Sequence, residues 1–129
     1  MSISSHLRRA YRATEYRAAG LSLRIGRRSH ALDGLLHGMG AREAVLITAC
    51  NPRSRLTQAG RNADMMRRLQ AALRRRTAYP AESGAGRWTE AQLLAACPAA
   101  WAGVVARRFR QNALVVLRPG QTPRLRVLV

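Results

Sequence analysis

Lysine is absent from this chain of 129 residues, and acidic residues are scarce. All 23 basic residues are therefore arginines, and with 6 acidic residues they give a formal net charge of +17. A positive field of this size on a small domain attracts polyanions or an acidic protein partner. An arginine excess can equally reflect the coding composition of a genome, although guanidinium groups bind phosphate well whatever their origin. The charge alone leaves both explanations open.

Cysteine and histidine are also rare. Cys50 and Cys97 are too few for a disulfide framework and do not have the spacing of a metal site. We expect both to be buried thiols in a reducing compartment. His30, Asp33 and His37 fall on one side of a predicted helix, but the two histidines are two turns apart and cannot easily share one ion. No metal and no cofactor is predicted.

Long hydrophobic runs are missing as well. The uncharged stretch over residues 93–106 is too short to span a bilayer and contains Pro98. The N-terminus lacks the continuous apolar stretch of a secretory signal, so we expect a cytoplasmic protein without membrane contact. The length fits one domain over residues 1–129, with residues 1–13 considered as a flexible N-terminal segment. The oligomeric state is left open.

In the first half of the chain, the spacing of apolar residues predicts strands and helices in turn. Residues 14–17 and 21–25 are expected to pair as a hairpin. Ser29 is a candidate N-cap for a short helix that ends at the glycines of "GMG", and residues 44–49 form a buried strand. Thr57 is a candidate cap for a helix that runs to about Arg76, with its apolar residues in one stripe.

The second half is predicted less uniformly. Residues 77–88 are expected to be a short strand and a Gly-rich loop, while residues 89–97 fit a helix or a strand. Pro98 is placed at the first position of another long helix. Residues 113–117 and 125–129 are expected to close the chain as a hairpin. The whole pattern predicts an α+β domain whose sheet, mixed or mainly antiparallel, has about five to seven strands and is covered by three helices.

Amide side chains mark a candidate site. Asn51 ends the strand over 44–49, and Asn62 lies on the inward side of the next helix, where layered α/β folds often bind ligands. Ordinary turn chemistry is the competing explanation for Asn51. Gln111 and Asn112 either cap a helix end or face Asn51 and Asn62 across a pocket. Because amides do not titrate and Glu90 is the only acid nearby, such a pocket would bind rather than catalyse, and no catalytic residue is predicted.

Several segments in this order, "LRIG", "ITACNPRS", "RN" at 61–62, "RWTE" and "RFRQNALVV", resemble a bacterial family known as domain of unknown function 3293. The resemblance runs from about Tyr16 to the end of the chain. It implies a strand for "TEAQLLAA" and draws attention to Asn51, Ser54, Asn62, Gln111 and Asn112. Arg61 stands where the family commonly has Glu, and Arg110 where it has Gly. "WTEAQ" also lacks the Pro, the second Glu and the Ser of the usual "WPEES", which argues against any function that needs two acidic groups there.

Two main functions follow from these features. The first is a non-enzymatic binding module for nucleic acid or another polyanion, sequence-independent and salt-sensitive, with an acidic protein as a further partner. Its phosphate contacts are assigned to Arg53, Arg55, Arg61, Arg67, Arg68, Arg74, Arg75 and Arg76. The alternative is a small-molecule pocket, or an enzyme of unknown reaction. Its ligand contacts are assigned to Asn51, Ser54, Asn62, Trp88, Glu90, Gln111 and Asn112.

Overall fold

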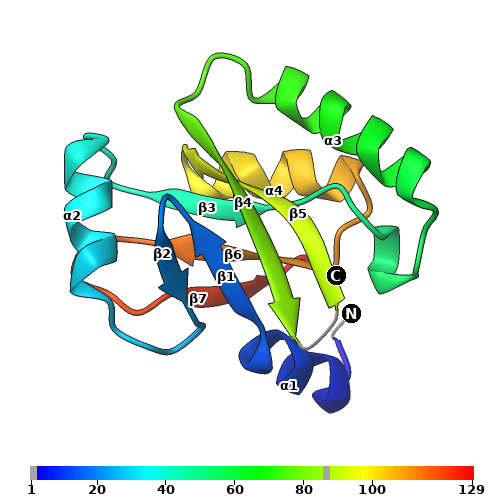
Figure 1. Ribbon diagram of the computed structural model, residues 1–129, viewed down its shortest axis with the longest axis horizontal. Helices are drawn as coiled ribbons and strands as arrows, with labels where there is room; N and C mark the ends of the chain where they lie inside the picture. Colours follow the sequence, from blue (N-terminus) through cyan, green and yellow to red (C-terminus); the bar gives the residue numbers. More distant parts are fainter. Residues whose placement is uncertain (1–2, 86–87) are drawn as a thin grey trace.

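A computed structural model describes residues 3–85 and 88–129 of the chain (Figure 1). In this part, seven strands form one sheet in the order β2-β1-β4-β5-β3-β6-β7, and neighbouring strands run antiparallel. The elements are α1 (Ser5–Ala13), β1 (Glu15–Ala18), β2 (Leu21–Leu23), α2 (His30–Gly38), β3 (Ala44–Ile47), the 3-10 helix η1 (Pro52–Ser54), α3 (Ala59–Ala72), β4 (Ala78–Ala85), β5 (Trp88–Ala96), α4 (Ala99–Arg108), β6 (Ala113–Leu117) and β7 (Arg124–Val127). The α+β class and the mainly antiparallel sheet are confirmed, with one helix more than expected.

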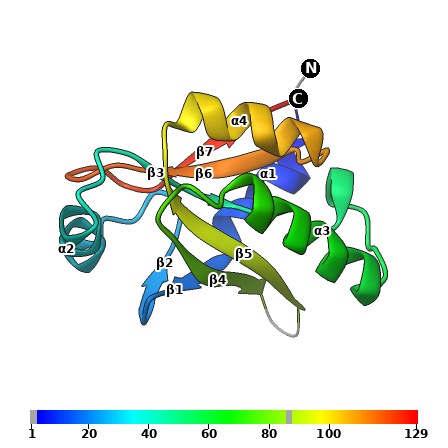
Figure 2. The same cartoon turned by 90° about the horizontal axis from the view of Figure 1, so that it is seen from above.

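The sheet curls into a half-barrel with an outer and an inner face (Figure 2). Because successive side chains of a strand point to opposite faces, each central strand contributes side chains to two apolar clusters, one on each face of the sheet. On the outer face, Val45, Leu93 and Val116 belong to a cluster with residues of α3 and α4. On the inner face, Leu46, Leu94 and Val115 belong to a cluster with Leu32 and Leu36 of α2. The inner face is therefore packed at the end that α2 covers.

Helix α1 occupies most of the segment considered as flexible. Ser4 caps it, since the Leu7 N–H donates to the Ser4 Oγ over 3.1 Å. An Arg24 guanidinium N–H donates to the Ala13 carbonyl at 2.8 Å and ties the last turn to the chain after β2. No residue of α1 is fully buried, so this helix lies on the sheet without entering the core. Within the described residues, no helix has the length and apolar character needed to cross a membrane.

Helix α3 is shorter than predicted at both ends. Its N-cap is Gln58 and not Thr57, because the Thr57 hydroxyl donates to the Arg55 carbonyl and the Thr57 N–H donates to the Asn51 Oδ1. The helix ends at Ala72, so Arg74, Arg75 and Arg76 follow it rather than continue its outward face. The predicted apolar stripe is confirmed, since Met66, Leu69 and Leu73 are buried.

The prediction of a Gly-rich loop within residues 77–88 is wrong for most of that segment. β4 is a continuous strand from Ala78 to Ala85 that pairs with β5 from end to end. Pro80 fits within it because pairing with β1 begins only at Ala81, so Pro80 lies where β4 has one neighbour. Residues 86 and 87 lie outside the described part. The strand favoured for "TEAQLLAA" is confirmed as β5.

Candidate functional site

The inner face changes from apolar to polar along three neighbouring strands. Leu46, Leu94 and Val115 belong to the packed cluster under α2. Moving two residues at a time away from α2 stays on the same face, because side chains alternate along a strand. These steps lead through Thr48, Gln92 and Ala113 and then to Cys50, Glu90 and Gln111. The three strands therefore present polar side chains together at the end of the sheet that α2 does not cover.

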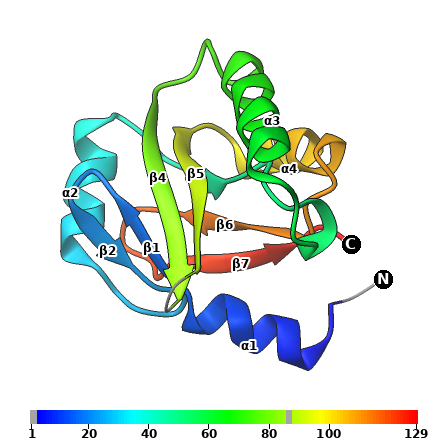
Figure 3. The same ribbon diagram turned by 45° about the vertical axis from the view of Figure 1, so that its right-hand side comes forward.

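A cavity of about 380 Å³ lies over this polar end. Helix α1 forms another wall and contributes Leu7, Ala10 and Tyr11. Figure 3 shows the position of this helix below the sheet. Leu46, Leu125 and other apolar side chains line the rest. The volume falls within the range of small-molecule sites, and the lining has their usual composition of apolar walls with a few polar groups. The arrangement is suited to enclose a compact organic ligand.

The structure brings most of the predicted ligand-binding residues to this cavity. Asn51, Ser54, Glu90 and Gln111 line it directly. Asn62 contacts Asn51 behind the wall, and an Asn112 side-chain N–H donates to the Ser54 Oγ at 2.9 Å. Trp88 opens β5, but its side chain lies outside the described residues.

The orientation of the Asn51 amide is fixed by the backbone. The Asn51 Oδ1 accepts the Thr57 N–H at 2.9 Å and an Asn62 Nδ2–H at 3.0 Å. The Asn62 Oδ1 in turn accepts the Asn51 N–H at 2.9 Å, which fixes the second amide as well. The Asn51 Nδ2 must therefore point away from these two donors. It donates to the Glu90 Oε2 at 2.7 Å.

Glu90 is held as a hydrogen-bond acceptor at the cavity wall. Besides the Asn51 contact, its Oε1 accepts a Gln92 Nε2–H at 3.1 Å, and the same amide nitrogen lies 3.1 Å from the Ser83 Oγ. Burial raises the pKa of the Glu90 carboxyl, and the Asn51 hydrogen bond offsets part of this rise. The structure therefore places Glu90 half-buried in a hydrogen-bonded network.

The other titratable groups around Glu90 stay neutral at physiological pH. Burial raises the pKa of the Tyr11 and Tyr16 hydroxyls and of the Cys50 thiol, and the nearby Glu90 carboxylate adds to each rise. A hydrogen bond with Ser54 lowers the pKa of Tyr11 by a smaller amount. Cys50 and Cys97 are both free and buried, as predicted. Among the described residues that line the cavity, Glu90 is the one acidic side chain, and none is basic.

Gln111 has mainly a structural role. Its Nε2 donates to the Cys50 carbonyl at 3.0 Å and to the Phe109 carbonyl at 3.3 Å. These bonds join the end of α4 to the chain that follows β3, which agrees with the predicted use of this amide on helix-end carbonyls.

Sequence reasoning missed Tyr11, Thr48, Ser83 and Gln92 as cavity residues. A signal existed for Gln92, because it interrupts the inner-face series between Glu90 and Leu94. A second signal lay in "LRRAYRAT", where Leu7, Ala10, Tyr11 and Thr14 recur at helical spacing. Neither signal shows that α1 packs across the inner face.

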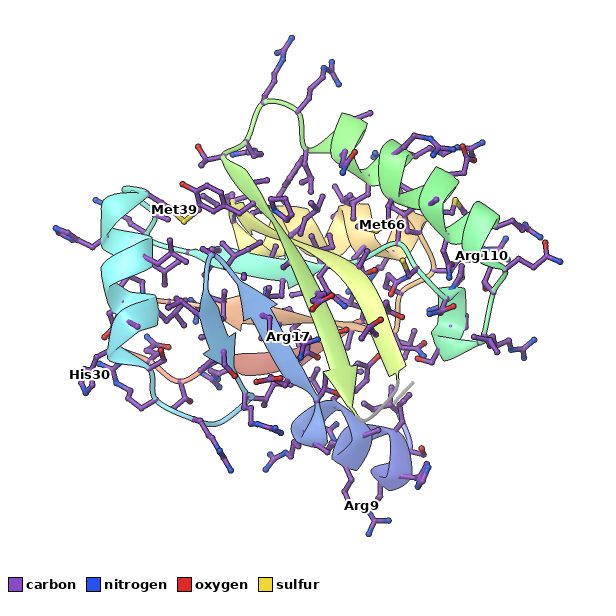
Figure 4. The ribbon with its side chains drawn as sticks, viewed as in Figure 1. Arg9, Arg17, His30, Met39, Met66 and Arg110 are labelled. Atoms are coloured by element: carbon purple, nitrogen blue, oxygen red, sulfur yellow. The ribbon has the colours of Figure 1, made fainter. Side chains whose placement is uncertain are left out.

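The arginines assigned to phosphate contacts are exposed but are not separated from the other arginines. Arg61, Arg67 and Arg68 lie on α3, and both Arg67 and Arg68 pair with Asp64. Arg76 stacks on Trp101, with its guanidinium carbon 4.5 Å from the ring centroid. Figure 4 shows two other arginines at distant places on the molecule, Arg9 on α1 and Arg110 near η1. Exposed arginines therefore lie on several sides.

The other arginines assigned to phosphate contacts are exposed as well. Arg53 lies in η1, and one of its N–H groups is 3.5 Å from the Gln111 carbonyl. Arg55, Arg74 and Arg75 are exposed in the segments beside α3. Among the described residues, no cluster of three or more His, Cys, Asp or Glu side chains is arranged to hold a metal ion.

Comparison with known proteins gives one match. A family model described as "Protein of unknown function (DUF3293)" matches residues 47–114. The matched stretch begins at the end of β3 and ends in β6, so it contains all the residues predicted for either site. It does not include α1, which forms a wall of the cavity. No curated protein and no solved structure matches the chain.

Proposed function

Because the chain belongs to the family described as Protein of unknown function (DUF3293), whose description assigns no activity, we propose its function from the geometry of its cavity. The protein binds a small organic molecule between α1 and the polar end of the inner sheet face. The ligand contacts apolar walls and forms hydrogen bonds with the polar groups around Glu90.

One observation carries this proposal: amide and carboxyl side chains distant in sequence converge on one cavity. Asn51 and Glu90 are bonded to each other, and Asn62 and Gln92 hold them from either side. If Asn51 served only to stabilise the turn after β3, the single bond between its side chain and the Thr57 backbone would be sufficient. The further bonds position two polar groups at the wall of an open space, which is the arrangement of a ligand site.

The chemistry of the lining supports binding rather than catalysis. A nucleophile needs an adjacent base or a lowered pKa. Burial raises the pKa of the Cys50 thiol, and Ser54 has Tyr11 and Asn112 as its side-chain partners. Glu90 is bound by two amide donors that do not titrate.

Filling the cavity is expected to abolish binding. Ala113 lines it from β6, so Ala113→Leu inserts a larger side chain among the ligand contacts. In methyl NMR spectra of the unsubstituted protein titrated with a small-fragment set, the Leu46 and Val115 methyls should shift. The Leu69 and Leu73 methyls under α3 should not. The Ala113→Leu variant should weaken binding by about tenfold or more, since a clash in a closed site costs more than about 1.4 kcal/mol.

The matched control is Ala100→Leu, which makes the same change at an exposed position of α4. It should leave the fragment shifts unchanged. Equal shifts in Ala113→Leu and the unsubstituted protein would place the bound fragments outside the cavity and would contradict the proposed function.

The exposed face of α3 supports a second candidate function, polyanion binding. Arg67 and Arg68 are each 68% exposed, Arg61 is exposed near the start of the same helix, and Arg75 is exposed in the segment after it. Although Arg67 and Arg68 also pair with Asp64, these exposed guanidinium groups are able to contact phosphates along a nucleic-acid backbone. This candidate ranks second because other arginines are exposed on several further elements.

Polyanion binding predicts a salt-dependent affinity that depends on α3. Duplex DNA or RNA should bind more weakly as salt rises, with the logarithm of the binding constant falling linearly against the logarithm of the salt concentration. The double variant Arg67→Gln/Arg68→Gln should lose more affinity than its control on α1, Arg8→Gln/Arg9→Gln. Fluorescence anisotropy at several salt concentrations measures both effects. Equal losses in the two variants would show non-specific attraction to the net charge and would contradict an α3 interface.

A further inference from the structure

Glu90 differs from the other five acidic residues in the type of side chain with which it is paired. The chain has six acidic residues and 23 arginines. Five of the six pair with arginine: Glu15 and Glu82 with Arg17, Asp33 with Arg28, Glu43 with Arg118, and Asp64 with Arg67 and Arg68. Among the described residues, Glu90 has no basic partner. No arginine is found among the described residues that line its cavity either.

The Glu90 carboxylate retains acceptor capacity toward the cavity. Each of its oxygens takes one amide hydrogen bond in the structure, from Asn51 and from Gln92. A carboxylate offers about four lone-pair sites, so about two remain for a ligand. The Asn51 amide cannot turn to offer its oxygen in their place, because the Thr57 N–H and Asn62 occupy that oxygen. The site is thus arranged to present an acceptor with negative charge.

Removing a carboxylate from water without a counter-charge is costly even when it is half-buried, and this cost is reduced when a cation binds. The groups that face Glu90 from the packed elements are Tyr11 of α1, Tyr16 of β1 and Cys50 after β3. All three are neutral or, if ionised, negative, so none supplies a positive charge. As far as the described residues are concerned, a positive charge for Glu90 then has to come from a ligand.

We infer that the ligand of the cavity is an organic cation, whose ammonium or amidinium group donates to Glu90 while its apolar body contacts the surrounding walls. This inference rests on the proposed function and adds the class of ligand. The walls that receive the apolar body include Leu7, Leu46, Val115 and Leu125. A formal net charge of +17 repels cations from the surface in general, so a preference for a cation must come from the cavity itself.

Compounds with one skeleton and different charge test the inference. Benzyl, cyclohexylmethyl and hexyl groups are each attached to an ammonium, a hydroxyl or a carboxylate, and all are titrated at about pH 8. The Leu46 and Val115 methyl signals report binding in the cavity, which separates it from binding of carboxylates to surface arginines. The ammonium compounds should bind about tenfold more tightly than the matched alcohols, as expected for a hydrogen bond to a charged group.

Glu90→Gln is the deciding variant. It removes the charge but retains the length, and the Gln92 amide can turn to accept the new N–H because the Ser83 hydroxyl can donate as well as accept. The variant should bind ammonium compounds no more tightly than alcohols. Its control is Glu82→Gln on the neighbouring strand β4, where the glutamate pairs with Arg17 at the surface. This control should retain the tenfold preference.

The pKa of the Glu90 carboxyl, compared with and without a bound compound, gives a test that does not depend on any variant. A bound cation favours the carboxylate, so it should lower the pKa of Glu90, as followed by the carbon signal of its carboxyl group. By linkage, the affinity for an ammonium compound should fall as pH decreases through this pKa, while the affinity for an alcohol should not.

The possible failures are distinguishable. If no compound of any charge shifts the Leu46 and Val115 methyls, the proposed function is wrong and the inference falls with it. If the alcohols or carboxylates shift them at equal or lower concentration than the ammonium compounds, the cavity binds ligands but the inferred class is wrong. An unchanged preference in Glu90→Gln would equally overturn the role of Glu90.

Discussion

Replacing Leu94 by alanine is expected to lower the free energy of unfolding by about 2–5 kcal/mol, the range found when a fully buried leucine is truncated. Leu94 is 0% exposed and lies in β5, a central strand with β4 and β3 on its two sides. It belongs to the inner cluster that also holds Leu36 of α2 and Tyr16 of β1. Truncation leaves a void among elements that cannot all move to fill it, since α2 and the sheet are joined by other contacts.

The matched control is Leu56→Ala, because Leu56 is 76% exposed in the segment before α3. This variant should change the stability by no more than about 0.5 kcal/mol. Urea unfolding followed by circular dichroism measures both values. A loss below about 1 kcal/mol in Leu94→Ala would show that the inner face is loosely packed, contrary to the structure.

Local patterns predicted most of the elements because each depends on a few neighbouring residues. Ser29 caps α2 as expected, with its Oγ accepting the Leu32 N–H at 3.1 Å, and Gly40 takes a positive φ of 65° beyond the helix. The two hairpins formed by β1 with β2 and by β6 with β7 are confirmed. Only a short strand followed by a loop was predicted where β4 lies, because Pro80 and Gly84 are typical of turns and only the pairing with β5 shows that they lie in one continuous strand.

The candidate site was predictable in part. Asn51 and Asn62 were paired correctly because both belong to one strand-to-helix unit, where local geometry brings them together. The cavity itself was not predictable, because it depends on the curl of the whole sheet and on how α1 crosses it. The role of Glu90 follows only from these long-range features, since its burial and the absence of an arginine beside it among the described residues are properties of the folded chain.

Asn51→Ala is expected to lower the free energy of unfolding by about 3 kcal/mol or more, for two reasons. The first is the loss of three side-chain bonds: the Thr57 N–H loses its acceptor, at about 1–3 kcal/mol for a buried group, and the Asn62 amide and the Glu90 carboxylate each lose one of their hydrogen bonds. The second is the backbone. Asn51 has a φ of 47° and a ψ of 63°, a left-handed conformation that costs alanine about 1–2 kcal/mol.

Two further variants separate these contributions from each other. Asn51→Gly removes the same bonds but adopts the left-handed conformation freely, so the difference between Gly and Ala reports the backbone cost. Asn51→Asp retains the oxygen that Thr57 and Asn62 need but replaces the donor facing Glu90 with a second carboxylate. This like charge should raise the pKa of Glu90, and the variant should lose stability as pH rises through that pKa.

Asn112→Ala is the control for the amide network, because its bond to Ser54 lies at the surface. It should cost no more than about 1.5 kcal/mol, the net value of one ordinary hydrogen bond. Urea unfolding at several pH values compares all four variants. A similar small loss in Asn51→Ala and Asn112→Ala would mean that the bonds around Asn51 contribute no more than a surface contact. In that case the network would not hold Glu90 in place, and the turn explanation of Asn51 would be sufficient.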